Sequence, residues 1–119
     1  MTKAEYVKKG NTICKKAEEE RFAIFEEESQ KLSPKEERER EKQEEVLLAG
    51  MRSYERAIEK LDELGLPAGS EEKAESLLGS MEEAFERVQQ DPGTVLVSDA
   101  PFKKANEEAE SLGLDNCVT

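Results

Sequence analysis

Apolar residues recur along this chain with the spacing of one face of an α-helix, in four segments separated by proline and glycine. The breaks fall at Pro34, 65–69, 92–93 and Pro101. Between them, apolar side chains repeat at intervals of three and four residues, as in amphipathic helices. The pattern predicts an all-α protein with helices at about 3–32, 34–64, 71–90 and 100–112.

Residues that favour helix starts precede these segments. Thr2 and Glu5 have the spacing of a capping box, in which each side chain bonds a free backbone N–H of the first turn. Ser33 and Glu36 repeat this pattern, with Pro34 at the first helical position, where a proline has no N–H to lose. The second helix is therefore expected to start at Pro34.

The later helix ends also carry capping signals. The Leu-Gly-Leu sequences at 64–66 and 112–114 are typical of Schellman caps, in which Gly takes a left-handed conformation and the following Leu folds back on the last turn. Ser70 is expected to cap the third helix. Either Ser98 or Asp99 is expected to cap the fourth.

The short connections predict neighbouring helices that run antiparallel, in a single domain spanning 1–119. The expected architecture is an antiparallel up-down-up-down four-helix bundle in which helices one and two are longer than helices three and four. At 1.5 Å per residue, the first two helices would project beyond the others by roughly 15 Å. The tip of this hairpin lies near Ser33, and 35–45 has no apolar residue, so the tip is expected to fray.

A short apolar segment after the third helix allows a structural or a functional interpretation. Val95, Leu96 and Val97 form a short apolar connector, which we expect to lie as a lid over Phe22 and Phe25. The alternative is a small exposed apolar patch for a partner.

Gly50 and Gly79 lie inside predicted helices, where glycine costs about 1 kcal/mol relative to Ala. They indicate either a close helix crossing or a small groove, and a groove would allow an apolar ligand into the bundle interior.

Composition and charge limit the partners of this protein. Charged residues make up 39% of the 119 residues and apolar residues 35%, with 5% aromatic and no Trp, so the core must be thin. The net charge of −11 opposes binding to nucleic acid or to an anionic membrane surface, so no nucleic-acid partner is expected. No apolar stretch approaches the ~18–20 residues of a membrane span, so no transmembrane segment is expected in this chain.

The residues needed for common enzyme mechanisms are missing. The chain has no His, and it contains neither a nucleophile elbow nor a phosphate-binding loop. The acidic runs 18–20 and 26–28 cannot converge on one ion, because successive helical residues point about 100° apart. We therefore expect no enzyme activity, and no catalytic, cofactor-binding or metal-binding residues.

The two cysteines, Cys14 and Cys117, are the candidate functional pair. Cys14 lies on the apolar stripe of the first helix, and Cys117 follows the end of the fourth helix. An antiparallel fourth helix would bring its tail to the lower third of the first helix, close to Cys14. Two interpretations are open at this point: a disulfide, or two buried thiols, since free Cys is among the most buried residue types.

Several short motifs resemble a family of small secreted or lipid-anchored helical proteins of actinobacteria. They are Tyr-Val at 6–7, Asn-Thr-Ile-Cys-Lys-Lys-Ala at 11–17, and the segments 61–71, 101–106 and 109–117. The resemblance covers nearly the whole chain. It implies a mature extracytoplasmic domain whose leader is missing here, in which Cys14 pairs with Cys117 of the final Gly-Leu-x-x-Cys. The family has no assigned biochemical activity.

Three functions fit these observations. The first is a non-catalytic extracytoplasmic module, closed by a disulfide, that contacts another protein through the projecting hairpin or an outer helix face. The second is a cytosolic acidic adaptor with reduced thiols. The third is a binder of a small apolar ligand that uses the bundle interior. Neither the partner nor the oligomeric state follows from the sequence.

Overall fold

The computed structural model describes residues 1–119 and contains helices without any strand. Its α-helices are α1 (Lys3–Gln30), α2 (Arg40–Glu63), α3 (Glu71–Gln90), α4 (Pro92–Val97) and α5 (Lys103–Leu112). Three short 3₁₀ turns are η1 (Glu36–Arg38), η2 (Ala100–Phe102) and η3 (Asp115–Cys117). The prediction of an all-α protein is confirmed.

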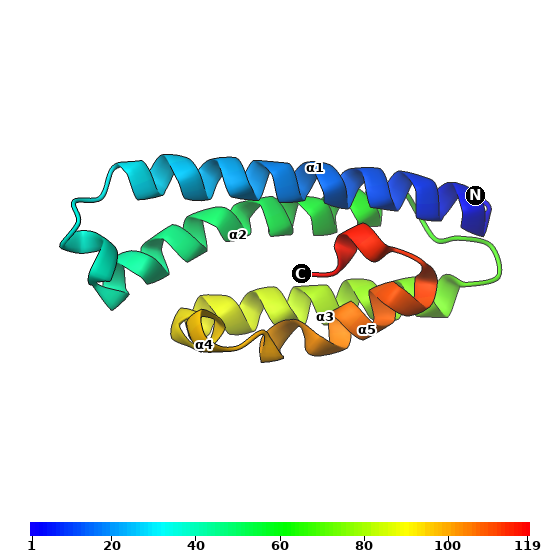
Figure 1. Cartoon of the computed structure of the whole chain (residues 1–119). Helices are drawn as coiled ribbons and strands as arrows, with labels where there is room; N and C mark the ends of the chain where they lie inside the picture. The colour runs from blue at the N-terminus through cyan, green and yellow to red at the C-terminus, as the bar shows by residue number, and fades with distance from the viewer.

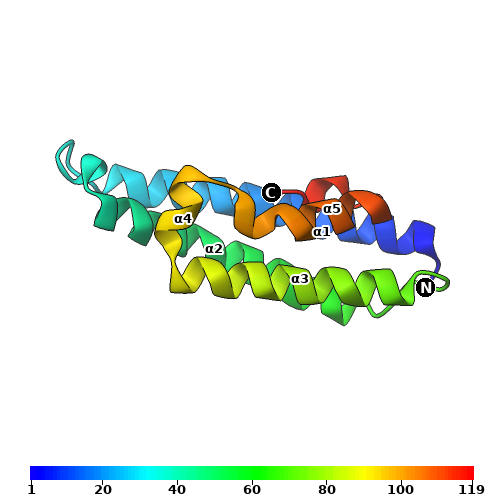
Figure 2. The same cartoon turned by 90° about the horizontal axis from the view of Figure 1, so that it is seen from below.

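The four longer helices, α1, α2, α3 and α5, lie along the length of an elongated molecule that measures 52 × 22 × 18 Å (Figure 1). The most extensive contacts join α1 to α2, and further contacts join α2 to α3 and α3 to α5. Seen from below, α3 and α5 lie side by side, with α2 behind α3 (Figure 2). The C-terminal turn η3 contacts both α1 and α5, so it fills the space between them.

The α1–α2 hairpin extends beyond α3 and α5, and the segment between α1 and α2 forms its tip (Figure 1). This projecting hairpin is as the helix lengths predicted. Leu32 at the tip is only partly exposed, whereas Ser33, Pro34 and Lys35 are exposed. The tip therefore has little apolar surface to hold it in place.

The predicted start of the second helix at Pro34 is wrong, although the capping box forms. The N–H of Glu36 donates to Ser33 Oγ at 3.2 Å, and the N–H of Ser33 donates to Glu36 Oε1 at 3.1 Å. Only the short turn η1 follows, because Glu39 is extended (φ −79°, ψ 125°) and α2 begins at Arg40. Without apolar residues to pack on α1, a cap alone does not sustain a helix here.

The two Leu-Gly-Leu sequences behave differently. At the end of α5 the N–H of Leu114 donates to the carbonyl of Ala109 at 2.9 Å, and Gly113 is left-handed (φ +86°), so the predicted Schellman cap is confirmed. At the end of α2, Gly65 is also left-handed, but Leu66 is 39% exposed and does not fold back.

The other predicted caps are right in part. Thr2 Oγ1 accepts from the N–H of Glu5 at 3.1 Å. Ser70 makes no capping hydrogen bond; instead Glu71 Oε1 accepts from the N–H of Gly69 at 2.9 Å. Ser98 Oγ accepts from the N–H of Ala100 at 3.1 Å, so it caps η2 and not the longer helix.

The fourth predicted helix, at 100–112, is divided between η2 and α5, which begins at Lys103.

The apolar connector 95–97 does not cover Phe22, so the predicted lid is wrong for this ring. These residues belong to α4, which packs on α2 and α3. Phe22 is 59% exposed and Val97 is 80% exposed. Pro92 stands at the first turn of α4 and starts a new helix directly after Asp91, which keeps the connector beside α2 and α3.

Candidate functional site

The feature that most distinguishes this molecule is the attachment of the C-terminal segment to α1. Cys14 of α1 and Cys117 of η3 lie at disulfide distance, with 2.00 Å between the sulfur atoms and 5.0 Å between the Cα atoms. Both side chains are buried. The prediction that packing brings these two cysteines together is confirmed.

Asn11 fixes the same segment by hydrogen bonds, one turn before Cys14. Its Nδ2 donates to the carbonyl of Gly113 at 3.1 Å, and its Oδ1 accepts from the N–H of Asn116 at 3.0 Å. The amide therefore bonds one backbone group directly after α5, at Gly113, and one within η3, at Asn116. We call Asn11, Cys14, Gly113, Asn116 and Cys117 the C-terminal clasp.

A second asparagine repeats this arrangement at the end of the tail. Asn106 of α5 donates from Nδ2 to the carbonyl of Thr119 at 3.0 Å, and its Oδ1 accepts from the N–H of Thr119 at 2.9 Å. Sequence reasoning missed the roles of Asn11 and Asn106. Their positions could have indicated these roles. Each is an Asn that borders the apolar stripe of its helix, and Asn is unfavourable in the interior of a helix.

Apolar contacts complete the clasp. Leu114 is fully buried, and a Cβ added at Gly10 would lie 2.7 Å from its Cδ2. The absence of a side chain at Gly10 thus lets the tail approach α1 closely. The only space beside the disulfide is about 20 Å³, lined in part by Tyr54, Met81 and Val118. That volume holds about one water molecule and is far below the ~300–1,000 Å³ typical of ligand pockets.

The two glycines expected at a close crossing or a groove differ. At Gly50, the ring of Phe25 occupies the place of a side chain, so α1 and α2 approach closely there. At Gly79 no atom lies within 4 Å of an added Cβ, and the residue is exposed, so the prediction of a close crossing is wrong for this position.

Both tyrosines are buried and hold their protons strongly. Burial raises the pKa of Tyr54, an effect that the positive charge of Arg21 partly offsets. Burial also raises the pKa of Tyr6, whose hydroxyl has no hydrogen-bond partner. The unpaired phenol of Tyr6 lies in the closed core, so this side chain has a packing role, and the ring of Tyr54 packs edge-on against Phe102 with 5.5 Å between the centroids.

The carboxylates are dispersed over the surface. No group of three or more Asp, Glu, Cys or His residues is arranged to hold a metal ion. The shifted carboxyl groups belong to local turns: hydrogen bonds from the backbone and then the side chain of Ser33 lower the pKa of Glu36, and those from the N–H groups of Glu71 itself and of Gly69 lower the pKa of Glu71. None of the helices combines the length and apolar content that crossing a bilayer requires.

Comparison with known proteins identifies no relative. A scan against protein-family models, a search of curated proteins and a search of solved structures each give no match. Any functional conclusion therefore rests on the clasp, the hairpin and the charge distribution of this chain.

Proposed function

We propose that this chain is a non-catalytic extracytoplasmic helical module that contacts another protein through the projecting hairpin or an outer helix face. In this proposal α1, α2, α3 and α5 form an up-down-up-down four-helix bundle. The module resembles the small secreted or lipid-anchored actinobacterial proteins to which its motifs are similar. Its role is to present a surface held in shape by the clasp.

The Cys14–Cys117 pair is the observation that carries the proposal. Disulfides persist in oxidising compartments and are rare in the cytosol. The pair joins positions separated by 103 residues, and in the chain-entropy model the closure of a loop of this size stabilises a domain by ~4–5 kcal/mol. That is a large share of the ~5–15 kcal/mol of a typical domain, so a thin-cored protein gains much from an oxidising environment.

The contact role is supported by what the surface offers. Phe22 is a large aromatic side chain that is 59% exposed on the outer side of α1. The hairpin tip extends away from the rest of the molecule, where a partner can reach it from several sides (Figure 1). The two most enclosed spaces measure only about 20 Å³, beside the disulfide, and about 100 Å³, between α1 and α2 near Ile13 and Ala57, which favours a surface role over binding of an apolar ligand.

Thiol trapping in the native host tests the compartment. Cells are quenched in acid, free thiols are alkylated, and the intact mass of the protein is measured before and after reduction. The proposal predicts no alkylation before reduction and two alkylated cysteines after it. Alkylation of both cysteines without reductant would instead support a cytosolic acidic adaptor.

A photo-crosslinking amino acid tests the contact role. It is placed at Phe22, and in a matched variant at Ser76, which is exposed on α3. We expect a discrete crosslinked species from position 22 and none from position 76. Equal crosslinking from both positions, or from neither, would argue against an outer face of α1 as the contact surface.

A further inference from the structure

The outer face of α1 carries exposed residues with the spacing of a coiled-coil seam. Alternate steps of four and three residues lead through Lys8, Thr12, Lys15, Glu19, Phe22 and Glu26, and all six are exposed. This is the spacing at which helical side chains line up along one face and meet a second helix. The core-facing side of α1 packs on α2, and η3 packs beside it, so this face has no partner within the chain. We call these six residues the outer stripe of α1.

The charges of the outer stripe are separated along the helix. Lys8 and Lys15 lie in its first half, and Glu19 and Glu26 lie in its second half. A second copy of α1 laid antiparallel, with the twofold axis at Ala17, brings together residues that are equally far before and after position 17. Lys8 then faces Glu26, and Lys15 faces Glu19, and the twofold symmetry forms each ion pair twice.

The same register gives Phe22 a partner. Phe22 and Thr12 are equally distant from position 17, so the exposed ring of one copy packs against Thr12 of the other. Burial of two Phe22 rings and of the aliphatic stems of Lys8 and Lys15 supplies apolar contact area. In this one register, every residue of the outer stripe faces a residue of the other copy with which it can form an ion pair or an apolar contact.

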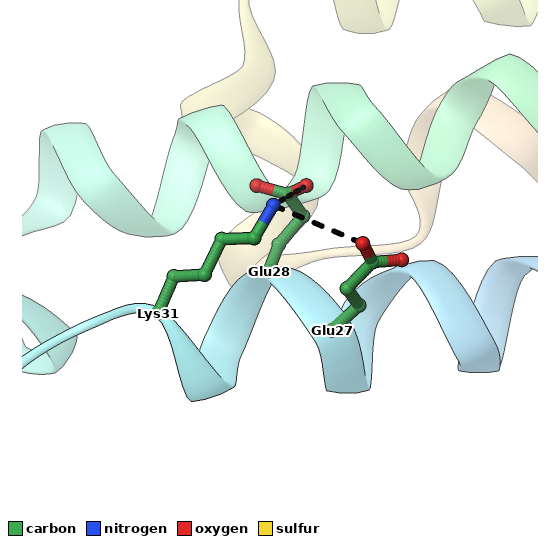
Figure 3. Close-up of polar contacts among 3 residues, drawn as sticks. All are labelled: Glu27, Glu28 and Lys31. Carbon is green, nitrogen blue, oxygen red and sulfur yellow. Dashed lines mark hydrogen bonds and ion pairs between the residues drawn. The ribbon is translucent and has the colours of Figure 1, made fainter.

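The charged groups of the outer stripe make no ion pair within the chain; they are Lys8, Lys15, Glu19 and Glu26. Their one side-chain contact is a long hydrogen bond that Glu26 Oε1 accepts from Gln30 Nε2 at 3.5 Å. Lys31, outside the stripe, shows the contrast: its Nζ lies 3.8 Å from Glu27 Oε1 and 3.3 Å from Glu28 Oε1 (Figure 3). Lys15 precedes Glu19 by four residues, which is the less favourable order for a pair within one helix.

We propose that two copies of this chain associate through the outer stripe of α1 as an antiparallel twofold dimer. The inference rests on the proposed function in one respect, that an outer helix face makes the contact. The seam is mostly charged, so the dimer is weak and sensitive to salt. Lys16 and Glu18 lie on opposite flanks of the outer stripe, so each lies beside its own copy near the axis, where screening by salt limits the repulsion.

Sedimentation equilibrium of the full chain, with its disulfide intact, measures the association. We expect a reversible monomer–dimer equilibrium at low ionic strength. Raising the salt from about 0.1 M to about 1 M shortens the Debye length from ~10 Å to ~3 Å and should weaken the dimer at least about tenfold.

Charge reversal gives the decisive comparison. Lys8→Glu with Lys15→Glu makes the stripe wholly acidic, and Glu19→Lys with Glu26→Lys makes it wholly basic, so each double variant alone should be monomeric. Mixed together, the two double variants should form a heterodimer, and the chain with all four changes should again form a homodimer. The control is Lys103→Glu with Lys104→Glu, at exposed positions of α5. It changes the net charge as much as Lys8→Glu with Lys15→Glu does, and it should leave the dimer intact.

Three results would each overturn the inference. They are a monomer at concentrations up to about 1 mM, a dimer unaffected by the double reversals, and a failure of the mixed reversals to associate. Circular dichroism and intact mass confirm that each variant is folded and oxidised. A monomer would leave the compartment proposal untouched, because thiol trapping tests that proposal independently.

Discussion

The ring of Phe25 in α1 fills the space where a side chain at Gly50 of α2 would stand. A Cβ at Gly50 would lie 2.7 Å from Cζ and 2.9 Å from Cδ1 of Phe25. These distances are well inside van der Waals contact. The two residues therefore set how closely α1 and α2 approach at this point of the hairpin.

Substitution of Gly50 by Ala should destabilise the protein, because the ring of Phe25 must move. Overpacking of this kind costs ~1–3 kcal/mol. Gly79→Ala is the matched control: it is an exposed helical glycine with open space around it, so it should stabilise the protein by ~0.5–1 kcal/mol. Urea denaturation measures both, and equal effects of the two substitutions would refute the close contact.

Reduction of the Cys14–Cys117 disulfide should lower the free energy of unfolding by ~4–5 kcal/mol, because the unfolded chain regains the freedom that the closed loop denies it. Denaturation with and without a phosphine reductant measures this difference. The double variant Cys14→Ser/Cys117→Ser should match the reduced wild type. A loss below about 1 kcal/mol would show that the covalent link adds little to the packing.

Asn11→Ala should loosen the C-terminal clasp without breaking the disulfide. It removes the hydrogen bonds to the part-buried carbonyl of Gly113 and to the exposed N–H of Asn116, each of which contributes ~0.5–1.5 kcal/mol. We expect faster reduction of the disulfide by dithiothreitol and faster hydrogen exchange at the amide of Asn116. Asn106→Ala releases only Thr119, so it should change the reduction rate less.

Tyr6→Phe should leave stability unchanged or raise it by ~1 kcal/mol, because the buried hydroxyl of Tyr6 has no partner. Thermal unfolding measures the effect. Tyr6→Ala, which removes the ring, should instead cost ~3–5 kcal/mol. A clear loss of stability in the Phe variant would indicate a hydrogen bond to this hydroxyl.

Alkaline pH should unfold the protein through its two tyrosines. Burial raises the pKa of both Tyr6 and Tyr54 in the folded state, so their contribution to stability is fully present below the unfolded value near 10 and is lost as the pH rises above it. The tyrosinate absorbance near 295 nm should rise together with the loss of helical circular dichroism. Ionisation at an ordinary pKa in the folded protein would show that water reaches the rings.

The apolar pattern predicted the helices where packing determines them and failed where it does not. The expected α3 segment, 71–90, matches the structure, because its apolar stripe from Ala74 to Val88 is buried along its whole length. The start at Pro34 failed because hydrogen bonds at Ser33 and Glu36 form locally, whereas a helix without apolar contacts gains nothing from continuing. Local capping signals alone were insufficient to locate a helix start.

The proximity of the two cysteines was predictable from the sequence, and the polar contacts of the clasp were not. The depth of Cys14 along the first helix and the length of the last helix determine that the two sulfurs lie at similar heights. Whether Asn11 faces the tail depends on the path of 113–116 after the Schellman cap, and helix periodicity carries no information about that path. The predicted position of 95–97 was wrong for a similar reason, since Pro92 can begin a helix as well as end one.

The disulfide also determines how the molecule would respond to mechanical load. Suppose that the chain is pulled at a point before Cys14 and at a point after Cys117. The tension then passes directly through the sulfur–sulfur bond, because the cysteines connect neighbouring points on α1 and η3. The intervening helices then carry almost none of the force. Stretching the oxidised protein in this way would straighten only the short segments outside the ring, whereas the reduced protein would extend through its entire helical body.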